Sequence, residues 1–313
     1  MIPLLLALAL SADAPSQGRD RATLLADAAA ALEAGRRTEA RQLLKEAADR
    51  FQSVSALLQL ARLQSGERDA AGALETLQRA RTLAPNSEEV LSAIAQLALA
   101  ARLPVPAAGA LEALTRMCPD VAQYHYLFGV ALMTAGDTVR ATDSLQTADR
   151  LEPGRSLTLA ALGLALNNRK QFAEAKTALS RSLEIDPERG ETIAALAEAE
   201  ASLGDVEAAE QHARRALELA PADPTAHLVI GMVRLQQSRY EDARDALVKA
   251  AAADPQSAKA DYQLSLVYAR LGDTATAERH LESYRRKLAE TNARVKAMRT
   301  DTLPPAVKPG GGR

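Results

Sequence analysis

The amino-acid sequence predicts an all-α solenoid built of about eight tandem helix-turn-helix units. Three ladders of residues with a common period of 34 carry this prediction. One ladder consists of the prolines Pro85, Pro119, Pro153, Pro187, Pro221 and Pro255, and a second consists of the alanines Ala73, Ala107, Ala141, Ala175, Ala209, Ala243 and Ala277. The third, always a small residue, runs Ala95, Gly129, Gly163, Ala197, Gly231 and Ser265. A unit this short cannot bury its apolar face alone, so stacked neighbours are expected to share one core.

Each unit follows the same order of elements. A first helix carries the small residue of the third ladder in its middle, as in residues 124–136. A turn such as Gly136-Asp137 follows, where Gly accepts the left-handed backbone and Asp caps the next helix. The second helix places Ala141 and Leu145 on one stripe, and the closing Pro prevents its continuation. The units are expected to begin at Arg21, Val54, Glu88, Ala122, Ser156, Gly190, Pro224 and Ala258.

This pattern resembles the tetratricopeptide repeat family, whose period is 34 and whose eighth, twentieth and thirty-second positions are small, small and Pro. The resemblance covers residues 21–289. It implies a right-handed α-solenoid whose concave side is lined by the first helices and binds protein segments. The first unit departs from the pattern, because Gln52 stands where the closing Pro is expected. Terminal repeats are often atypical, since one of their faces has no neighbour.

The two ends of the chain read differently. Residues 1–17 hold an apolar run from Ile2 to Leu10 and small residues at Ala12 and Ala14, which is typical of a secretory signal. Export, to a bacterial periplasm, is therefore the expectation, and a cytoplasmic protein is the alternative. At the other end, residues 290–301 are expected to extend the last helix. Residues 302–313 are rich in Pro and Gly and are expected to be disordered.

Nothing in the sequence predicts catalysis. The four histidines occupy repeat-equivalent positions on separate units, Cys118 is the single cysteine, and the glycines are spread over whole repeats. No metal site, no cofactor and no enzymatic activity are therefore expected. The net charge of −2 gives no general reason to expect nucleic acid as a partner, and no stretch is apolar enough to span a membrane.

The family resemblance places the partner-binding groove on the first helices. Reading its exposed positions onto this chain gives Tyr126, Val130, Met133, Leu164, Asn167, Leu228, Met232, Leu235, Tyr262 and Leu266. This lining is almost uncharged, which suits an apolar peptide or an amphipathic helix. The alternative at each position is that the side chain packs against a neighbouring first helix and is barely exposed.

The leading hypothesis is a non-catalytic scaffold or adaptor of the cell envelope that holds another protein in this groove. Two alternatives involve the C-terminal helix. Its apolar seam, Leu281, Tyr284, Leu288, Val295 and Met298, could pair with a second copy and form a homodimer. Residues 285–313, with eight Lys or Arg against two acidic residues, could instead contact an anionic surface.

Overall fold

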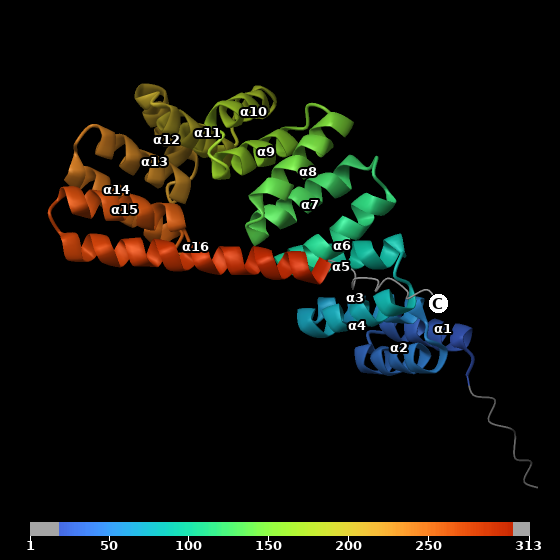
Figure 1. Cartoon of the computed structure of the whole chain (residues 1–313). Helices are drawn as coiled ribbons and strands as arrows, with labels where there is room; N and C mark the ends of the chain where they lie inside the picture. The colour runs from blue at the N-terminus through green and yellow to red at the C-terminus, as the bar shows by residue number, and fades with distance from the viewer. Residues whose placement is uncertain (1–18, 303–313) are drawn as a thin grey trace, which may run out of the picture. The chain divides into compact units, whose positions relative to one another are not determined.

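The computed structural model describes residues 19–302, which form helices joined by short turns (Figure 1). The first helices of the units are α1 (Arg21–Glu33), α3 (Val54–Gly66), α5 (Glu88–Ala100), α7 (Ala122–Ala135), α9 (Ser156–Asn168), α11 (Gly190–Leu203), α13 (Pro224–Gln236) and α15 (Ala258–Arg270). The second helices are α2 (Arg37–Phe51), α4 (Ala70–Leu83), α6 (Pro104–Met117), α8 (Thr138–Leu151), α10 (Phe172–Ile185), α12 (Val206–Leu219), α14 (Tyr240–Ala253) and α16 (Thr274–Thr302). Every first helix begins at the residue where the sequence places a unit. The fold is therefore the predicted α-solenoid of eight helical hairpins.

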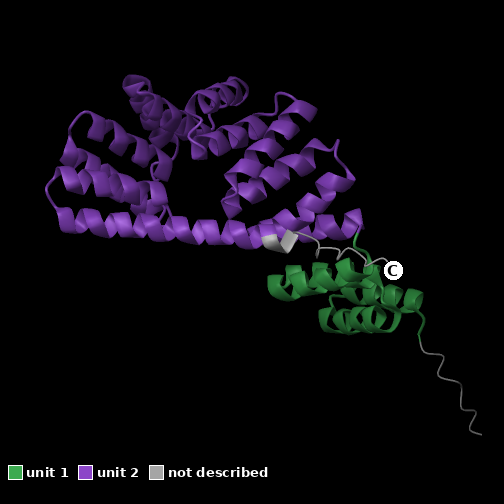
Figure 2. Ribbon diagram, viewed as in Figure 1, with its two compact units in different colours: residues 1–85 green, residues 86–313 purple. Residues whose placement is uncertain are grey.

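The chain divides into two compact units, residues 1–85 and residues 86–313 (Figure 2). Unit 1 holds the first two hairpins and unit 2 holds the other six. The sequence does not predict this division, because the break follows Pro85, one of six closing prolines that are alike. The expected signal and the expected C-terminal tail from residue 303 lie outside the described residues.

A left-handed residue stands in each turn between the two helices of a hairpin. Glycine supplies it in four hairpins, as at Gly136 with φ 93°, while Arg68, Arg102, Lys170 and Ser238 supply it in the others. Left-handed backbone ends the first helix and turns the chain into the second. The turn geometry is thus common to all eight hairpins even where the sequence lacks the expected Gly.

The core of unit 2 consists mainly of Ala and Leu. In three hairpins a Gly of the first helix faces a buried Leu of the second so closely that a Cβ on the Gly would collide with it. Such a Cβ would lie 2.5 Å from the Leu Cγ for Gly129 and Leu145, 2.3 Å for Gly163 and Leu179, and 2.4 Å for Gly231 and Leu247. The small-residue ladder therefore marks the close crossing of the two helices in a hairpin.

The last helix, α16, is twice as long as the other second helices, with 29 residues against 14 in α14. Its first half packs along α15, and its far end contacts α6 and α7. Within unit 2, α16 thus runs across from the last hairpin to the first two hairpins of the same unit (Figure 1). Among residues 19–302, no helix is both long enough and apolar enough to cross a bilayer.

Candidate functional site

All ten predicted groove residues lie in unit 2, on α7, α9, α13 and α15. Four of them, Tyr126, Val130, Met133 and Leu164, are half-buried and pack against one core cluster around Leu162 and Leu166. Met232 and Leu235 are likewise half-buried, against a second cluster. These side chains combine the two roles that the sequence left open, since part of each supports the core and part stays accessible.

Two of the ten are not exposed. Asn167 is only 2% exposed, and its Nδ2 donates a hydrogen bond to the carbonyl oxygen of Ala195 at 2.8 Å. Leu228 is 5% exposed and belongs to the core cluster with Leu264. For these two residues the burial matches the alternative that the side chain packs against neighbouring helices. The hydrogen bond of Asn167 links α9 to α11. Buried polar side chains in folded proteins are generally hydrogen-bonded in this way.

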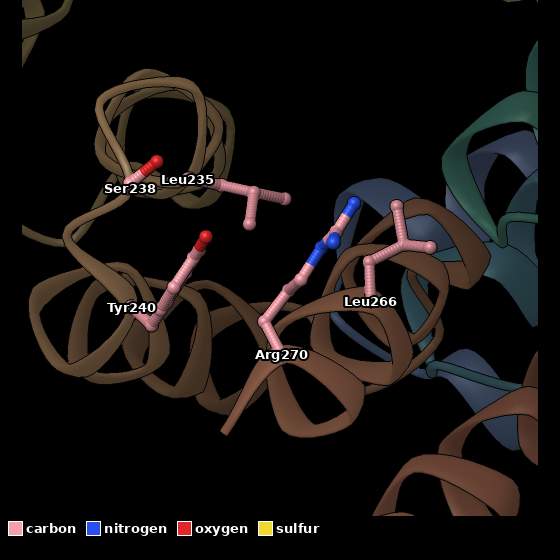
Figure 3. Close-up of a pocket in the computed structure, with 5 residues that line it drawn as sticks. All are labelled: Leu235, Ser238, Tyr240, Leu266 and Arg270. Carbon is pink, nitrogen blue, oxygen red and sulfur yellow. The ribbon is translucent and has the colours of Figure 1, made fainter. Parts of the chain in front are cut away.

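The most accessible apolar patch of the predicted groove lies on α15. Tyr262 is 41% exposed and Leu266 is 38% exposed, and their spacing of four residues puts them on one face of the helix. Leu266 also lines a pocket of about 270 Å³ with Leu235, Ser238, Tyr240 and Arg270. Figure 3 shows the guanidinium of Arg270 extending between Leu235 and Leu266. This pocket offers apolar contact from two leucines together with a cation and two hydroxyl groups.

Sequence reasoning missed the polar side of this pocket. Arg270 follows Leu266 by four residues, so the helical spacing could have placed it on the same face of α15. Sequence reasoning also missed the polar residues of a second pocket, of about 340 Å³, whose lining includes Asn168, Glu198, Leu228 and Lys259. There Lys259 pairs with the buried Glu198 of α11, two hairpins away along the chain. The inner face of unit 2 is therefore less uniformly apolar than the sequence predicted.

The four histidines have structural partners. His125 and His227 each place Nε2 near the carbonyl oxygen of the preceding closing proline, at 2.8 Å and 3.0 Å. His212 pairs with Glu200 at 2.7 Å, and this hydrogen bond raises the pKa of His212 above its ordinary value. Among residues 19–302, no three His, Cys, Asp or Glu side chains gather in a way that could hold a metal ion.

Asp261 of α15 binds three side chains from the first half of α16. It accepts hydrogen bonds from Lys287 at 2.6 Å, from Ser283 at 2.7 Å and from His280 at 2.9 Å. Burial works to raise the pKa of Asp261, but the hydrogen bonds from Lys287, His280 and Ser283 outweigh burial, so the pKa lies below its ordinary value. This carboxylate ties the half-buried Lys287 into the last hairpin.

The apolar seam of α16 packs largely within the chain, and two residues of the basic segment form ion pairs with other helices or turns. Tyr284 contacts Tyr262 with ring centroids 5.4 Å apart, and Met298 is fully buried. Of the basic residues, Lys287 pairs with Asp261 and Arg299 pairs with Asp137. Leu288 remains exposed, at 43%. Most of the apolar seam is thus covered by the chain itself, whereas Arg285, Arg286, Arg294 and Lys296 are exposed.

Comparisons with known proteins agree with this architecture. Models described as tetratricopeptide repeat match residues 55–87, residues 92–156 and 228–292, and residues 166–232. A search of curated proteins with this sequence finds no match. Tetratricopeptide repeats mediate protein interactions.

Solved structures share the fold at low sequence identity. A tetratricopeptide repeat protein from Parabacteroides merdae is 14% identical with a TM-score of 0.56, over 79% of this chain and 98% of that one. PilW, a type IV pilus biogenesis factor, is 17% identical with a TM-score of 0.51, over 68% and 97%. A chain of the Cut9–Hcn1 hetero-tetramer of APC/C is 19% identical with a TM-score of 0.53, over 77% of this chain and 48% of that one. With its helical hairpins, its period and these matches, the chain belongs to the tetratricopeptide repeat family.

Proposed function

We propose that this protein is a non-catalytic scaffold that holds an apolar segment of another protein against α13 and α15 of unit 2. The observation that carries the proposal is the pair Tyr262 and Leu266, two large apolar side chains exposed on one face of a first helix. Exposed apolar groups that are contiguous with a lined pocket are typical of interaction surfaces. Burying them contributes about 25 cal/mol per Å² before ordering costs.

The pocket beside this pair refines the chemistry of the partner. Arg270 lines it together with the hydroxyl-bearing Ser238 and Tyr240, and both hydroxyl and guanidinium groups donate hydrogen bonds. An apolar segment that carries a carboxylate at one end would match both parts of the pocket. Apolar burial is insensitive to salt, whereas the exposed carboxylate contact is screened. Binding is therefore expected to weaken only modestly as salt rises.

Replacing Leu266 by Glu should weaken binding strongly, because the substitution puts a charge into the apolar contact. A photo-reactive amino acid at position 266, introduced in the native host, would capture the partner and its contacting segment. Binding of that segment to the Leu266→Glu variant is expected to be about 30-fold weaker or worse, as for a central interface residue. Calorimetry measures this change, and circular dichroism checks that helicity is kept.

Val248→Glu is the matched control, since Val248 is 46% exposed on the second helix α14. It should bind the segment like the unaltered protein. Equal losses for both variants would reject the groove as the binding surface. Replacement of Arg286 and Arg294 by Ala tests the basic segment instead, and a loss of binding there would favour that alternative. Lys287 is unsuited to this test because it holds Asp261.

The site of action we propose is the bacterial cell envelope, reached by export. The support is the apolar run from Ile2 to Leu10 followed by small residues at Ala12 and Ala14. The exported protein is expected to begin between Ala12 and Gln17. Mass spectrometry of the N-terminal peptide of the native protein measures this, and an intact Met1 terminus on protein from the cytosol would contradict it.

A further inference from the structure

The far half of α16 is a helix that leaves its own hairpin. Lys287 lies near the carbonyl oxygen of Ser257, the residue directly before α15, so beyond Lys287 the helix has passed the end of its partner. The next three residues, Leu288, Ala289 and Glu290, are all exposed. Since successive side chains of a helix point about 100° apart, three exposed neighbours leave most of its circumference in solvent. Residues 288–290 therefore form a bridge of about one turn that has left α15 and is largely surrounded by solvent.

The bridge is fastened again at its far end. Thr291, Val295 and Met298 follow one stripe of the helix, and Met298 is fully buried. A Cβ built on Gly136 would lie 2.4 Å from Thr291 Cγ2 and 3.6 Å from Val295 Cγ2. The absence of a side chain at Gly136, in the turn between α7 and α8, therefore makes the room in which α16 sits.

An ion pair completes this contact. Arg299 donates to Asp137 from Nε at 3.1 Å and from Nη2 at 3.0 Å. The Asp137 side chain is 1% exposed, and it also accepts a bond from the backbone N–H of Arg140 at the start of α8. A bidentate guanidinium–carboxylate pair with a buried acceptor is among the stronger polar contacts in proteins. We call Gly136, Asp137, Thr291, Val295, Met298 and Arg299 the clasp.

The clasp is a small contact compared with the packing of α16 on α15. Its Arg299 side chain is 53% exposed, and α16 contacts α6 and α7 much less extensively than it contacts α15. Beyond Lys287, α16 runs on for about four turns, some 22 Å at 1.5 Å per residue, across the open side of unit 2, and the clasp residues of α16 lie within this stretch (Figures 1 and 2). The pocket that contains Asn168 and Lys259 also includes Ser257, which Lys287 contacts, so this pocket adjoins the point where α16 leaves α15.

We propose that α16 is a reversible strap across the inner face of unit 2, held by the clasp, and that its release admits the partner segment. The equilibrium between the closed clasp and the released helix exists whether or not there is a partner. Its role as a gate rests on the proposed function. A partner that binds only the open form would shift this equilibrium by its differential affinity.

Hydrogen exchange of the full-length protein, read by mass spectrometry, tests the clasp without any partner. Arg299→Ala removes the ion pair, and exchange of the amides in residues 288–299 is expected to rise about tenfold or more. Arg294→Ala is the matched control, because it removes an exposed arginine from the same helix. Met298→Glu should act like Arg299→Ala or more strongly. Identical exchange in the Arg299→Ala and Arg294→Ala variants would overturn the proposal.

The gate is tested by the rate at which reagents of two sizes reach an inner cysteine. Cys118→Ala removes the single cysteine, and Asn168→Cys places a thiol at an exposed position in the pocket that also contains Lys259. With the clasp closed, a maleimide bearing a long polyethylene glycol chain should react much more slowly than N-ethylmaleimide. Arg299→Ala should raise the rate with the bulky reagent about tenfold, in step with the opening of the clasp, and leave the small one unchanged.

Val248→Cys, on a second helix, should react alike in both backgrounds. Equal access of the bulky reagent to position 168 with and without Arg299 would overturn the gate, even if the clasp opens. Light scattering adds a third outcome. A dimer held together by Arg299 would mean that α16 fastens to a second copy, which also contradicts a strap within one chain. Failure of the Leu266→Glu test alone would reject the partner site and leave the strap standing.

Discussion

Gly163→Leu is expected to destabilise the protein by about 1–3 kcal/mol, because it forces a side chain into a filled helix crossing. The first atom of any side chain at this position would lie 2.3 Å from Leu179 Cγ and 2.6 Å from its Cδ2. Leu179 is fully buried, so it cannot swing into solvent. Either its rotamer must change or α9 and α10 must separate. Urea unfolding, followed by circular dichroism, measures the loss.

Gly109→Ala provides a control of opposite sign. Gly109 lies inside α6, and a Cβ built there would meet no atom within 4 Å. Alanine favours a helix over glycine by about 0.8–1 kcal/mol, so this variant should gain stability. Leu179→Ala, added to Gly163→Leu, should recover part of the loss because it makes room at the crossing. Equal effects of the glycine substitutions at positions 109 and 163 would mean that the small-residue ladder does not mark interhelical contacts.

Glu210→Gln is expected to lower the free energy of unfolding at neutral pH by roughly 3 kcal/mol. Arg234 of the next hairpin holds Glu210 with two hydrogen bonds, of 2.7 Å and 3.1 Å, and Arg214 adds a third at 2.5 Å. The hydrogen bond from Arg234 is the main cause that lowers the pKa of Glu210 from 4.5 to about 2. The side chains of Glu210 and Arg234 are 19% and 11% exposed, so solvent screens the pair only weakly.

The pH dependence follows from the direction of this shift. A carboxylate whose pKa is lower in the folded state contributes stability above its unfolded pKa, and this contribution is lost as the pH falls through the folded value. The difference between the protein and its Glu210→Gln variant should therefore be full above about pH 5 and vanish near pH 2. Thermal unfolding at pH 7, 5, 3 and 2 measures it.

Glu218→Gln is the control for this prediction. Glu218 lies on the same helix and pairs with Arg215, but its side chain is 65% exposed. Exposed pairs contribute about 0–1 kcal/mol, so this variant should unfold nearly like the unaltered protein at every pH. A Glu210→Gln variant whose deficit stays constant down to pH 2 would show that the ion pair with Arg234 does not cause it.

The repeat architecture could be predicted from sequence because its causes are local. Pro85 and its equivalents end helices through their own covalent geometry, and the spacing of Ala141, Leu145 and Ala148 defines a buried stripe without reference to distant residues. These effects recur at every period, so the eight hairpins and their starting residues follow from the pattern. Even the close crossing at Gly163 was foreseeable, since only a small residue permits it.

The candidate site was only partly predictable. Family spacing placed Tyr262 and Leu266 on the groove, yet the same rule also selected Asn167 and Leu228, which are buried. The difference depends on how far each first helix is rotated against its neighbours, and this rotation comes from packing along the stack. Arg270 entered the site because the end of α15 meets the turn before α14, an encounter between two hairpins.

Long-range closure was beyond the sequence pattern altogether. The apolar seam of α16 could be predicted from the sequence. Arg299 and Asp137, however, are 162 residues apart, and no periodicity relates them. Their meeting depends on the curvature that accumulates over several hairpins of unit 2, each adding a small rotation fixed by side-chain packing. Local chemistry therefore specifies the repeating unit, its turns and its caps. Which faces stay open, where the stack divides and what α16 fastens to are decided by tertiary packing, because only the sum of many small interhelical angles brings distant residues together.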